Sequence, residues 1–164
     1  MSLGSWIAKS ADGFVHDAAS FFAMGLKEKE NLRRAHLRSL RLACQNSDIL
    51  TWMIPLAEPF IQLVKSGASK PAQRLEGMYA LFLVAKIAAV DAKADEILAK
   101  EKIWQLVFQM DSSLISTTLA SKLSSDDCLA FMDLVEVLLL EHPHRVTEYS
   151  GSKQLLWSAG EWKL

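Results

Sequence analysis

Three arginines on one predicted helix are the residues of this chain whose spacing most suggests chemistry. Arg34, Arg38 and Arg41 recur at intervals of four and three residues within the segment 31–45, and on a helical wheel they form one stripe with Gln45. Guanidinium groups spaced in this way could bind phosphates of RNA or carboxylates of a partner protein. An ordinary solvated helix face explains the same pattern and is the favoured interpretation, because exposed charges commonly bind nothing.

Two further polar side chains of this helix, Arg33 and His36, fall on its apolar side. That side lies opposite the stripe and is defined by Leu32, Leu40, Ala43 and Cys44. We expect Arg33 to pair with a carboxylate of an adjacent helix. A hydrogen-bonded core histidine explains His36 better than a metal ligand or a base does.

The remaining polar motifs give weak indications of a reaction. His142 and His144 flank Pro143, but two histidines without further ligands nearby are a poor metal site, and basic side chains are common at a helix C-terminus. Asp126 and Asp127 suit a helix start rather than an acid–base pair, since sequence neighbours point apart on a helix. There is no Gly-rich phosphate loop, CxxC pair or HExxH motif. We therefore expect no catalytic residue, no cofactor, no metal and no small-molecule substrate, and an enzyme is the least favoured class.

Composition limits the remaining classes. The 164 residues are 51% hydrophobic, enough for the core of one domain, and 18 basic residues nearly balance 19 acidic ones. This balance argues against a protein that wraps nucleic acid through its global charge. Cys44 and Cys128 lie on predicted apolar helix faces, so buried free thiols are favoured over a disulfide. Because no apolar run is long enough to span a bilayer and no signal peptide is visible, we predict a cytoplasmic protein without membrane contact.

Residues that typically start or end helices recur along the whole chain, and we predict an all-α fold of about eight helices in antiparallel pairs. Residues 46–48 are predicted to close the second helix and cap the third, which Pro55 and Pro59 are expected to kink or delay. Residues 66–70 are the loosest predicted linker, and residues 91–95 are a predicted break. An irregular bundle or an α-solenoid of the HEAT or armadillo type fits this pattern. The first six predicted helices are Phe14–Leu26, Asn31–Gln45, Ile49–Lys65, Ala72–Val90, Ile97–Met110 and Leu114–Leu123. The seventh is capped by Ser124 or Ser125 and ends near Glu141 or His142, and the last is Ser152–Trp162.

The segment 124–145 indicates how tightly these helices must pack. It begins with a capping serine and two aspartates, is apolar for about four turns and stops before Pro143. Only Asp133 and Glu136 form a narrow solvent-facing edge on this helix, so it needs neighbours on nearly every side. The chain stops within the last predicted helix, where Trp157 and Trp162 would lack a cover. We therefore interpret residues 1–164 as one helical segment of a larger protein, with residues 1–3 as an added leader.

Three stretches carry a resemblance to a known family. They read LRRAHLRSL at 32–40, RLEGMYALFLVAKIAAVDAKADEILAKEKIWQLV at 74–107 and SSDDCLAFMDLVEVLLLEHPHRVT at 124–147. In order and spacing they resemble the N-terminal part of general control nonderepressible protein one, a family of very large HEAT-repeat translational activators.

The resemblance implies a scaffold rather than a catalyst. Members of that family bind translating or stalled ribosomes and promote activation of the kinase that phosphorylates the α subunit of translation initiation factor two. The implied partners are thus the ribosome and a protein kinase, both through the parent protein, and Arg34, Arg38 and Arg41 are the candidate contacts to ribosome, RNA or an acidic partner. The alternative function is a generic HEAT or armadillo adaptor that binds a peptide or protein.

Overall fold

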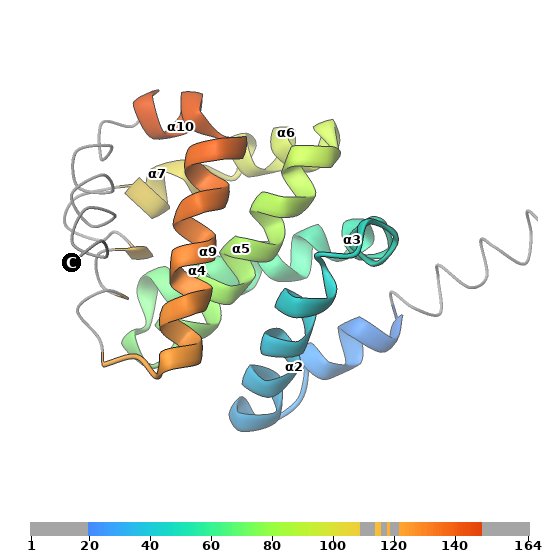
Figure 1. The fold of residues 1–164 in the computed structure, drawn as a ribbon. Coiled ribbons are helices and arrows are strands. Elements are labelled where there is room, and N and C mark those ends of the chain that lie inside the picture. Colours follow the sequence, from blue (N-terminus) through green and yellow to red (C-terminus); the bar gives the residue numbers. More distant parts are fainter. Residues whose placement is uncertain (1–19, 109–113, 116–117, 119–121, 149–164) are drawn as a thin grey trace, which may run out of the picture.

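The computed structural model describes residues 20–108, 114–115, 118 and 122–148, and every element in these ranges is a helix (Figure 1). The predicted all-α, solenoid-like class is therefore confirmed. The longer helices are α2 (Glu30–Ala43), α4 (Ala57–Ser69), α5 (Arg74–Val90), α6 (Ala92–Lys100) and α9 (Ser125–Glu141). The shorter ones are α3 (Ser47–Met53), η1 (Ile54–Leu56), η2 (Pro71–Gln73), α7 (Ile103–Phe108) and α10 (Pro143–Glu148). None of the described helices combines the length and apolarity needed to cross a bilayer.

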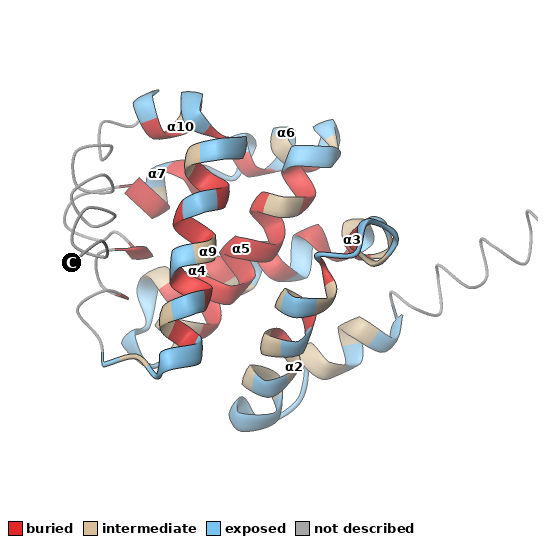
Figure 2. Cartoon of the chain, viewed as in Figure 1, coloured by how far each residue is buried: buried red, intermediate tan, exposed pale blue. Residues whose placement is uncertain are grey.

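Helix α5 is the centre of the molecule. It packs against α4, α9, α2 and α6, and its residues 76–85 are buried without interruption (Figure 2). An apolar sequence on all sides predicts such a position, because no face of the helix can be left in water. The other helices cover α5 and expose their outer faces (Figure 2).

Helices α4 and α5 form an antiparallel pair whose backbones touch. A Cβ atom on Gly67 would lie 2.7 Å from the Cα atom of Gly77, and one on Gly77 would lie 2.9 Å from the Cα atom of Gly67. The predicted linker at 66–70 is therefore wrong: α4 continues to Ser69, with Gly67 buried at the helix crossing. Glycine serves close packing here rather than flexibility.

The predicted cap of the third helix and its interruption by proline are confirmed. The Asn46 side chain accepts hydrogen bonds from the backbone N–H groups of Asp48 (2.9 Å) and Ile49 (3.2 Å), and so caps α3. Pro55 lies in the 3-10 turn η1, which separates α3 from α4. Because proline cannot donate a backbone hydrogen bond, the predicted helix 49–65 is divided at this point.

The break predicted at 91–95 is confirmed at Asp91 but is only one residue long. Asp91 alone interrupts the helices: its carboxylate accepts a hydrogen bond from the N–H of Ala94 at 3.1 Å and caps α6, which begins at once. A second turn lies eleven residues after Asp91, at Lys102, whose φ of 57° is in the left-handed region. The predicted helix 97–110 is consequently two helices, α6 and α7.

Helix α9 begins and ends as predicted but is less enclosed. Ser124 caps it by accepting the Asp127 N–H at 3.2 Å, and the helix stops at Glu141 before Pro143 opens α10. The expectation of neighbours on nearly every side is wrong for the described structure. Leu129 (54%), Met132 (43%) and Leu140 (70%) are exposed to solvent.

Several predictions fall wholly or partly outside the described residues. Residues 20–26 of the predicted helix Phe14–Leu26 are helical, as are residues 114, 115 and 118 of Leu114–Leu123. The final predicted helix, the leader at 1–3, Trp157 and Trp162 lie outside the described ranges.

Candidate protein-interaction surface

The predicted arginine stripe lies on the side of α2 that faces α5 and α9, and its guanidinium groups are paired within the chain. The first pair of contacts involves Glu76 of α5, whose side chain is fully buried. Arg33 donates to Glu76 Oε2 at 2.7 Å, which confirms its predicted pairing with a neighbouring helix. Arg34 Nε lies 3.7 Å from Glu76 Oε1, and Arg34 also pairs with Glu30 one turn earlier on α2.

Arg38 is the stripe residue with the most extensive network. Its Nε and Nη2 atoms donate to the two carboxylate oxygens of Asp127, each at 3.1 Å. The same carboxylate accepts the Tyr79 hydroxyl at 2.5 Å and the Ser124 hydroxyl at 2.9 Å. One carboxylate at the N-terminus of α9 therefore joins α2, α5 and the α9 cap.

The electrostatics of this network follow from burial and hydrogen bonding. Burial acts to raise the pKa of Asp127, but the hydrogen bonds from Arg38, Tyr79 and Ser124 together lower it below its ordinary value. Burial, helped by the negative Asp127, raises the pKa of Tyr79 to about 12. The hydrogen bond to Asp127 raises the pKa of Arg38. At neutral pH the carboxylate is thus ionised and the hydroxyl is a donor.

Arg41 completes the stripe by pairing with Asp133, six residues after Asp127 on α9. Its backbone carbonyl accepts the Cys44 thiol at 3.0 Å, and burial raises the pKa of that thiol to about 11. Cys44 and Cys128 are both free, as predicted, although Cys128 is half-buried rather than buried.

The structure therefore corrects which side chains of α2 are exposed to solvent. Exposed fractions of the side chains fall from 43% for Arg38 to 27% for Arg34 and 13% for Arg41, so the stripe is not an open solvated face. Leu32, placed on the apolar side by the helical wheel, is instead 59% exposed. Contact of the stripe with RNA or a partner stays a prediction.

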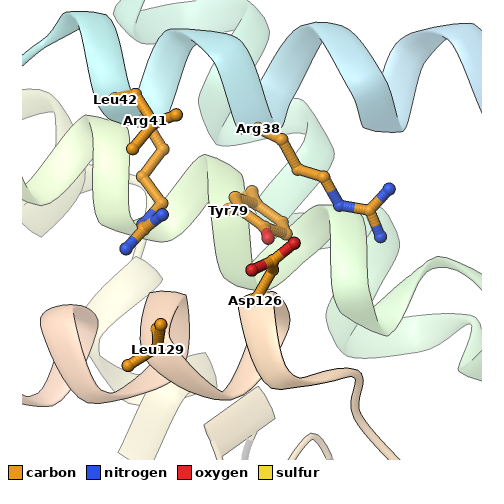
Figure 3. A pocket seen from close by; sticks show the side chains of 6 residues that line it. All are labelled: Arg38, Arg41, Leu42, Tyr79, Asp126 and Leu129. Atoms are coloured by element: carbon orange, nitrogen blue, oxygen red, sulfur yellow. The ribbon is translucent and has the colours of Figure 1, made fainter.

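A groove separates α2 from α9 above this network, and we call it the α2–α9 groove. It encloses about 310 Å³ and is lined by Arg38, Arg41, Leu42, Tyr79, Asp126 and Leu129. Figure 3 shows Leu42 on α2 and Leu129 on α9 at opposite sides, with the Arg41 side chain extending between them and with Tyr79 and Asp126 beside them. Leu42 is 61% exposed, so both walls present apolar side chains to solvent. This shape suits an inserted apolar side chain of a partner better than a reaction centre.

His36 and His142 occupy structural positions. His36 Nε2 lies 2.7 Å from the carbonyl oxygen of Phe22, and the half-buried ring has the hydrogen bond that was predicted for it. The buried His142 ring bonds the Ala85 carbonyl at 2.8 Å and packs on Trp104 with 5.0 Å between ring centroids. His144 is exposed. Among the residues that the structure describes, no three His, Cys, Asp or Glu side chains gather as metal ligands would.

Sequence reasoning missed the carboxylates that hold the stripe, although one had a visible signal. Asp127 precedes Phe131 by four residues and Leu134 by seven, which places it on the buried face of α9. The periodicity therefore marks Asp127 as an inward-facing charge that needs a cation. Glu76 and Tyr79 carry no such signal, because α5 is apolar on every side.

The fold and these contacts define an all-α, solenoid-like segment whose α2 face is joined to its neighbours by ion pairs. The chain is 51% identical over 154 residues to Protein ILITYHIA of Arabidopsis thaliana, an alignment that covers 94% of this chain and 6% of that protein. It is 31% identical over 120 residues to the stalled ribosome sensor GCN1 of Homo sapiens, and 32% identical to the Mus musculus protein of the same name. Each of these alignments covers 71% of this chain and 4% of the relative.

The resemblance inferred from the three sequence stretches is thus supported at the level of one segment, and the chain corresponds to a small part of each much longer relative. Neither a protein-family model nor a solved structure matches the chain.

Proposed function

We propose that this chain is a non-catalytic scaffold segment of a ribosome-associated translational activator in the cytoplasm. The observation that carries the proposal is the similarity of 120 of its residues to proteins named stalled ribosome sensors. The parent protein would promote activation of the kinase that phosphorylates the α subunit of translation initiation factor two, with the ribosome and that kinase as partners. Amino-acid starvation or ribosome stalling would be the trigger.

The structure limits how the arginine stripe could serve in this function. Arg34 and Arg41 are largely covered and engaged with carboxylates, whereas Arg38 keeps 43% of its side chain exposed while bound to Asp127. A contact with ribosomal RNA phosphate would therefore fall mainly on Arg38. The carboxylates around Arg38 repel phosphate and would therefore weaken this contact.

A segment replacement in the full-length parent protein tests the proposal. Residues 20–148 are exchanged for a helical repeat segment of similar length from an unrelated scaffold, and two readouts are taken. Ribosome co-sedimentation is measured at several salt concentrations, and phosphorylation of the initiation factor is measured under amino-acid starvation. We expect both to fall; if both persist at wild-type levels, this segment has no part in the function.

The stripe needs a separate variant, because glutamates at Arg34, Arg38 and Arg41 would face carboxylates and could unfold the segment. Arg38→Gln removes the positive charge of the most exposed stripe residue and keeps an amide donor beside Asp127. Lys93→Gln, at an exposed position on α6, makes the same charge change away from the stripe and is the matched control. Weaker co-sedimentation of the Arg38 variant alone supports a contact by the stripe.

The alternative, a generic adaptor that binds a peptide or protein, is favoured by the α2–α9 groove with its exposed leucines. Normal peptide capture by a protein that does not associate with ribosomes would support this alternative.

A further inference from the structure

The exposed face of α9 has an unusual combination of apolar and acidic side chains. Leu129, Met132, Glu136 and Leu140 follow one another at offsets of three, seven and eleven residues, which places them on one stripe of the helix. Three of the four are large apolar side chains with exposed fractions of 43% to 70%. With a rise of 1.5 Å per residue the stripe is about 16 Å long, which matches about three turns of a partner helix.

The charged side chains that α9 itself contributes are all negative. Helix α9 contains Asp126, Asp127, Asp133, Glu136 and Glu141 but no lysine, arginine or histidine. Arg38 neutralises Asp127 and Arg41 neutralises Asp133. The other three carboxylates are exposed and form no ion pair with any described residue. Three uncompensated negative charges therefore accompany the apolar stripe.

The α2–α9 groove lies at the N-terminal end of the same face. Leu129 belongs both to the stripe and to the groove, and Asp126 stands at the groove's rim (Figure 3). Leu42 of α2 forms the opposite wall and is 61% exposed. An apolar side chain inserted here would contact both leucines, and a cation beside it would reach Asp126.

We propose that the exposed face of α9 binds a basic amphipathic helix of a partner protein. The apolar side of that helix lies on Leu129, Met132 and Leu140, and one of its apolar side chains enters the α2–α9 groove. Its lysines or arginines face Asp126, Glu136 and Glu141. Apolar contact gives the affinity, and charge selects the partner and its direction.

Charge also separates this occupant from the others. Three uncompensated carboxylates repel the phosphates of RNA. A second copy of the chain would bring two acidic α9 faces together about a two-fold axis, which opposes like charges. The inference goes beyond the proposed function, because it requires neither a ribosome nor a kinase.

Fluorescence anisotropy on the 164-residue chain tests the binding. The probes are a labelled 18-residue amphipathic helix of leucine and lysine, the same peptide with glutamate in place of lysine, and an 18-nucleotide single-stranded uridine RNA. We expect the lysine peptide to bind at least tenfold more tightly than either other probe, with an affinity that falls as salt rises. Equal binding of the two peptides, or tighter binding of the RNA, would overturn the proposal.

Matched variants locate the site. Glu136→Lys should weaken the lysine peptide at least fivefold and strengthen the glutamate peptide, whereas Glu96→Lys, exposed on α6, should change neither by more than twofold. Leu129→Ser should weaken binding at least fivefold, and Leu32→Ser, at a similarly exposed leucine, should not. Equal effects of a variant and its control would place the binding elsewhere and refute the assignment.

Two further measurements identify the competing occupants. Sedimentation equilibrium that shows a dimer lost on Leu129→Ser would assign the face to a second copy and overturn the proposal. Ribosome co-sedimentation of the full-length parent protein with Glu136→Lys should be unchanged. Failure of peptide binding therefore stays distinguishable from failure of the proposed ribosomal function.

Discussion

The hydrogen-bonded group of Arg38, Tyr79, Ser124 and Asp127 should behave as one energetic unit, and Asp127→Asn is the change that tests it. The side chain of Asp127 is only 5% exposed and accepts hydrogen bonds from the other three residues. Asparagine keeps the shape, but it removes the charge and turns an amide donor toward groups that are themselves donors. The substitution therefore leaves polar groups unsatisfied without opening a cavity.

The magnitude follows from the exposure of the partners. Breaking a fully buried ion pair costs about 3–5 kcal/mol, but Arg38, at 43% exposed, can turn to water and recover part of this. We therefore expect Asp127→Asn to lower the free energy of unfolding by about 2–4 kcal/mol. Tyr79→Phe removes one of the hydrogen bonds to the carboxylate and should cost about 1–2 kcal/mol.

Urea denaturation followed by far-ultraviolet circular dichroism at pH 7 measures these changes. Because Tyr79 and Asp127 share one hydrogen bond, the double variant should cost less than the sum of the singles, with a coupling of about 1 kcal/mol or more. Asp126→Asn is the matched control, because it is adjacent, exposed and outside the network, and should cost at most about 1 kcal/mol from the helix dipole.

The pH dependence has a definite sign. The pKa of Asp127 is lowered in the folded state, so near its ordinary value the unfolded chain binds more protons than the folded chain. The stability from Asp127 is therefore complete above about pH 5 and is lost progressively as the pH falls further. The difference between wild type and Asp127→Asn should stay constant from pH 7 to about pH 5 and shrink below about pH 4.

Two results would refute this reasoning. One is a loss for Asp127→Asn no larger than for Asp126→Asn, which would show that the network contributes little. The other is strict additivity of Tyr79→Phe and Asp127→Asn, which would show that the two side chains do not share a bond in solution.

Three further predictions concern the backbone and the thiols. Gly67→Ala should lower the free energy of unfolding by about 1–3 kcal/mol, because its Cβ would lie 2.7 Å from the Gly77 backbone. Gln62→Ala, on the exposed face of α4, should not lower it, and chemical denaturation measures both variants. Lys102→Gly should raise it by about 0.5–1 kcal/mol by relieving the positive φ, and a loss of stability would contradict that geometry. Cys44 is buried and has a pKa of about 11, so it should react with iodoacetamide at least tenfold more slowly than half-buried Cys128 at pH 8. Mass-spectrometric time courses measure the two rates, and equal rates would contradict the burial of Cys44.

Local features of the fold were predictable because they depend on neighbouring residues. Asn46 and Ser124 cap helices because their oxygens reach N–H groups two or three residues ahead, and Pro55 divides a helix because it lacks a donor. The central place of α5 followed from its apolar sequence. The pairing of Arg33 was predictable because a charge on an apolar face needs a partner.

The features that were wrong depend on contacts between distant residues. Gly67 belongs to a helix rather than a linker because another glycine, ten residues later, lets the two backbones touch. Arg38 and Arg41 are paired rather than free because their carboxylates come from 89 and 92 residues further along the chain. A helical wheel gives the direction of a side chain but not what lies in that direction.

These distant ion pairs have a consequence for how the helices are positioned. Helix α5 is apolar on all sides, so hydrophobic burial alone allows it many rotations about its axis at similar free energy. Two of its buried residues, Glu76 and Tyr79, are polar: Glu76 Oε2 accepts a hydrogen bond from Arg33, and the Tyr79 hydroxyl donates one to Asp127. A rotation or slip of α5 would leave the Glu76 carboxylate unpaired, at a cost of about 3–5 kcal/mol, and the Tyr79 hydroxyl without its acceptor, at a cost of about 1–3 kcal/mol. We therefore infer that the arginines of α2 act first by fixing the register of α2, α5 and α9, and that this register sets the α2–α9 groove and the acidic face beside it.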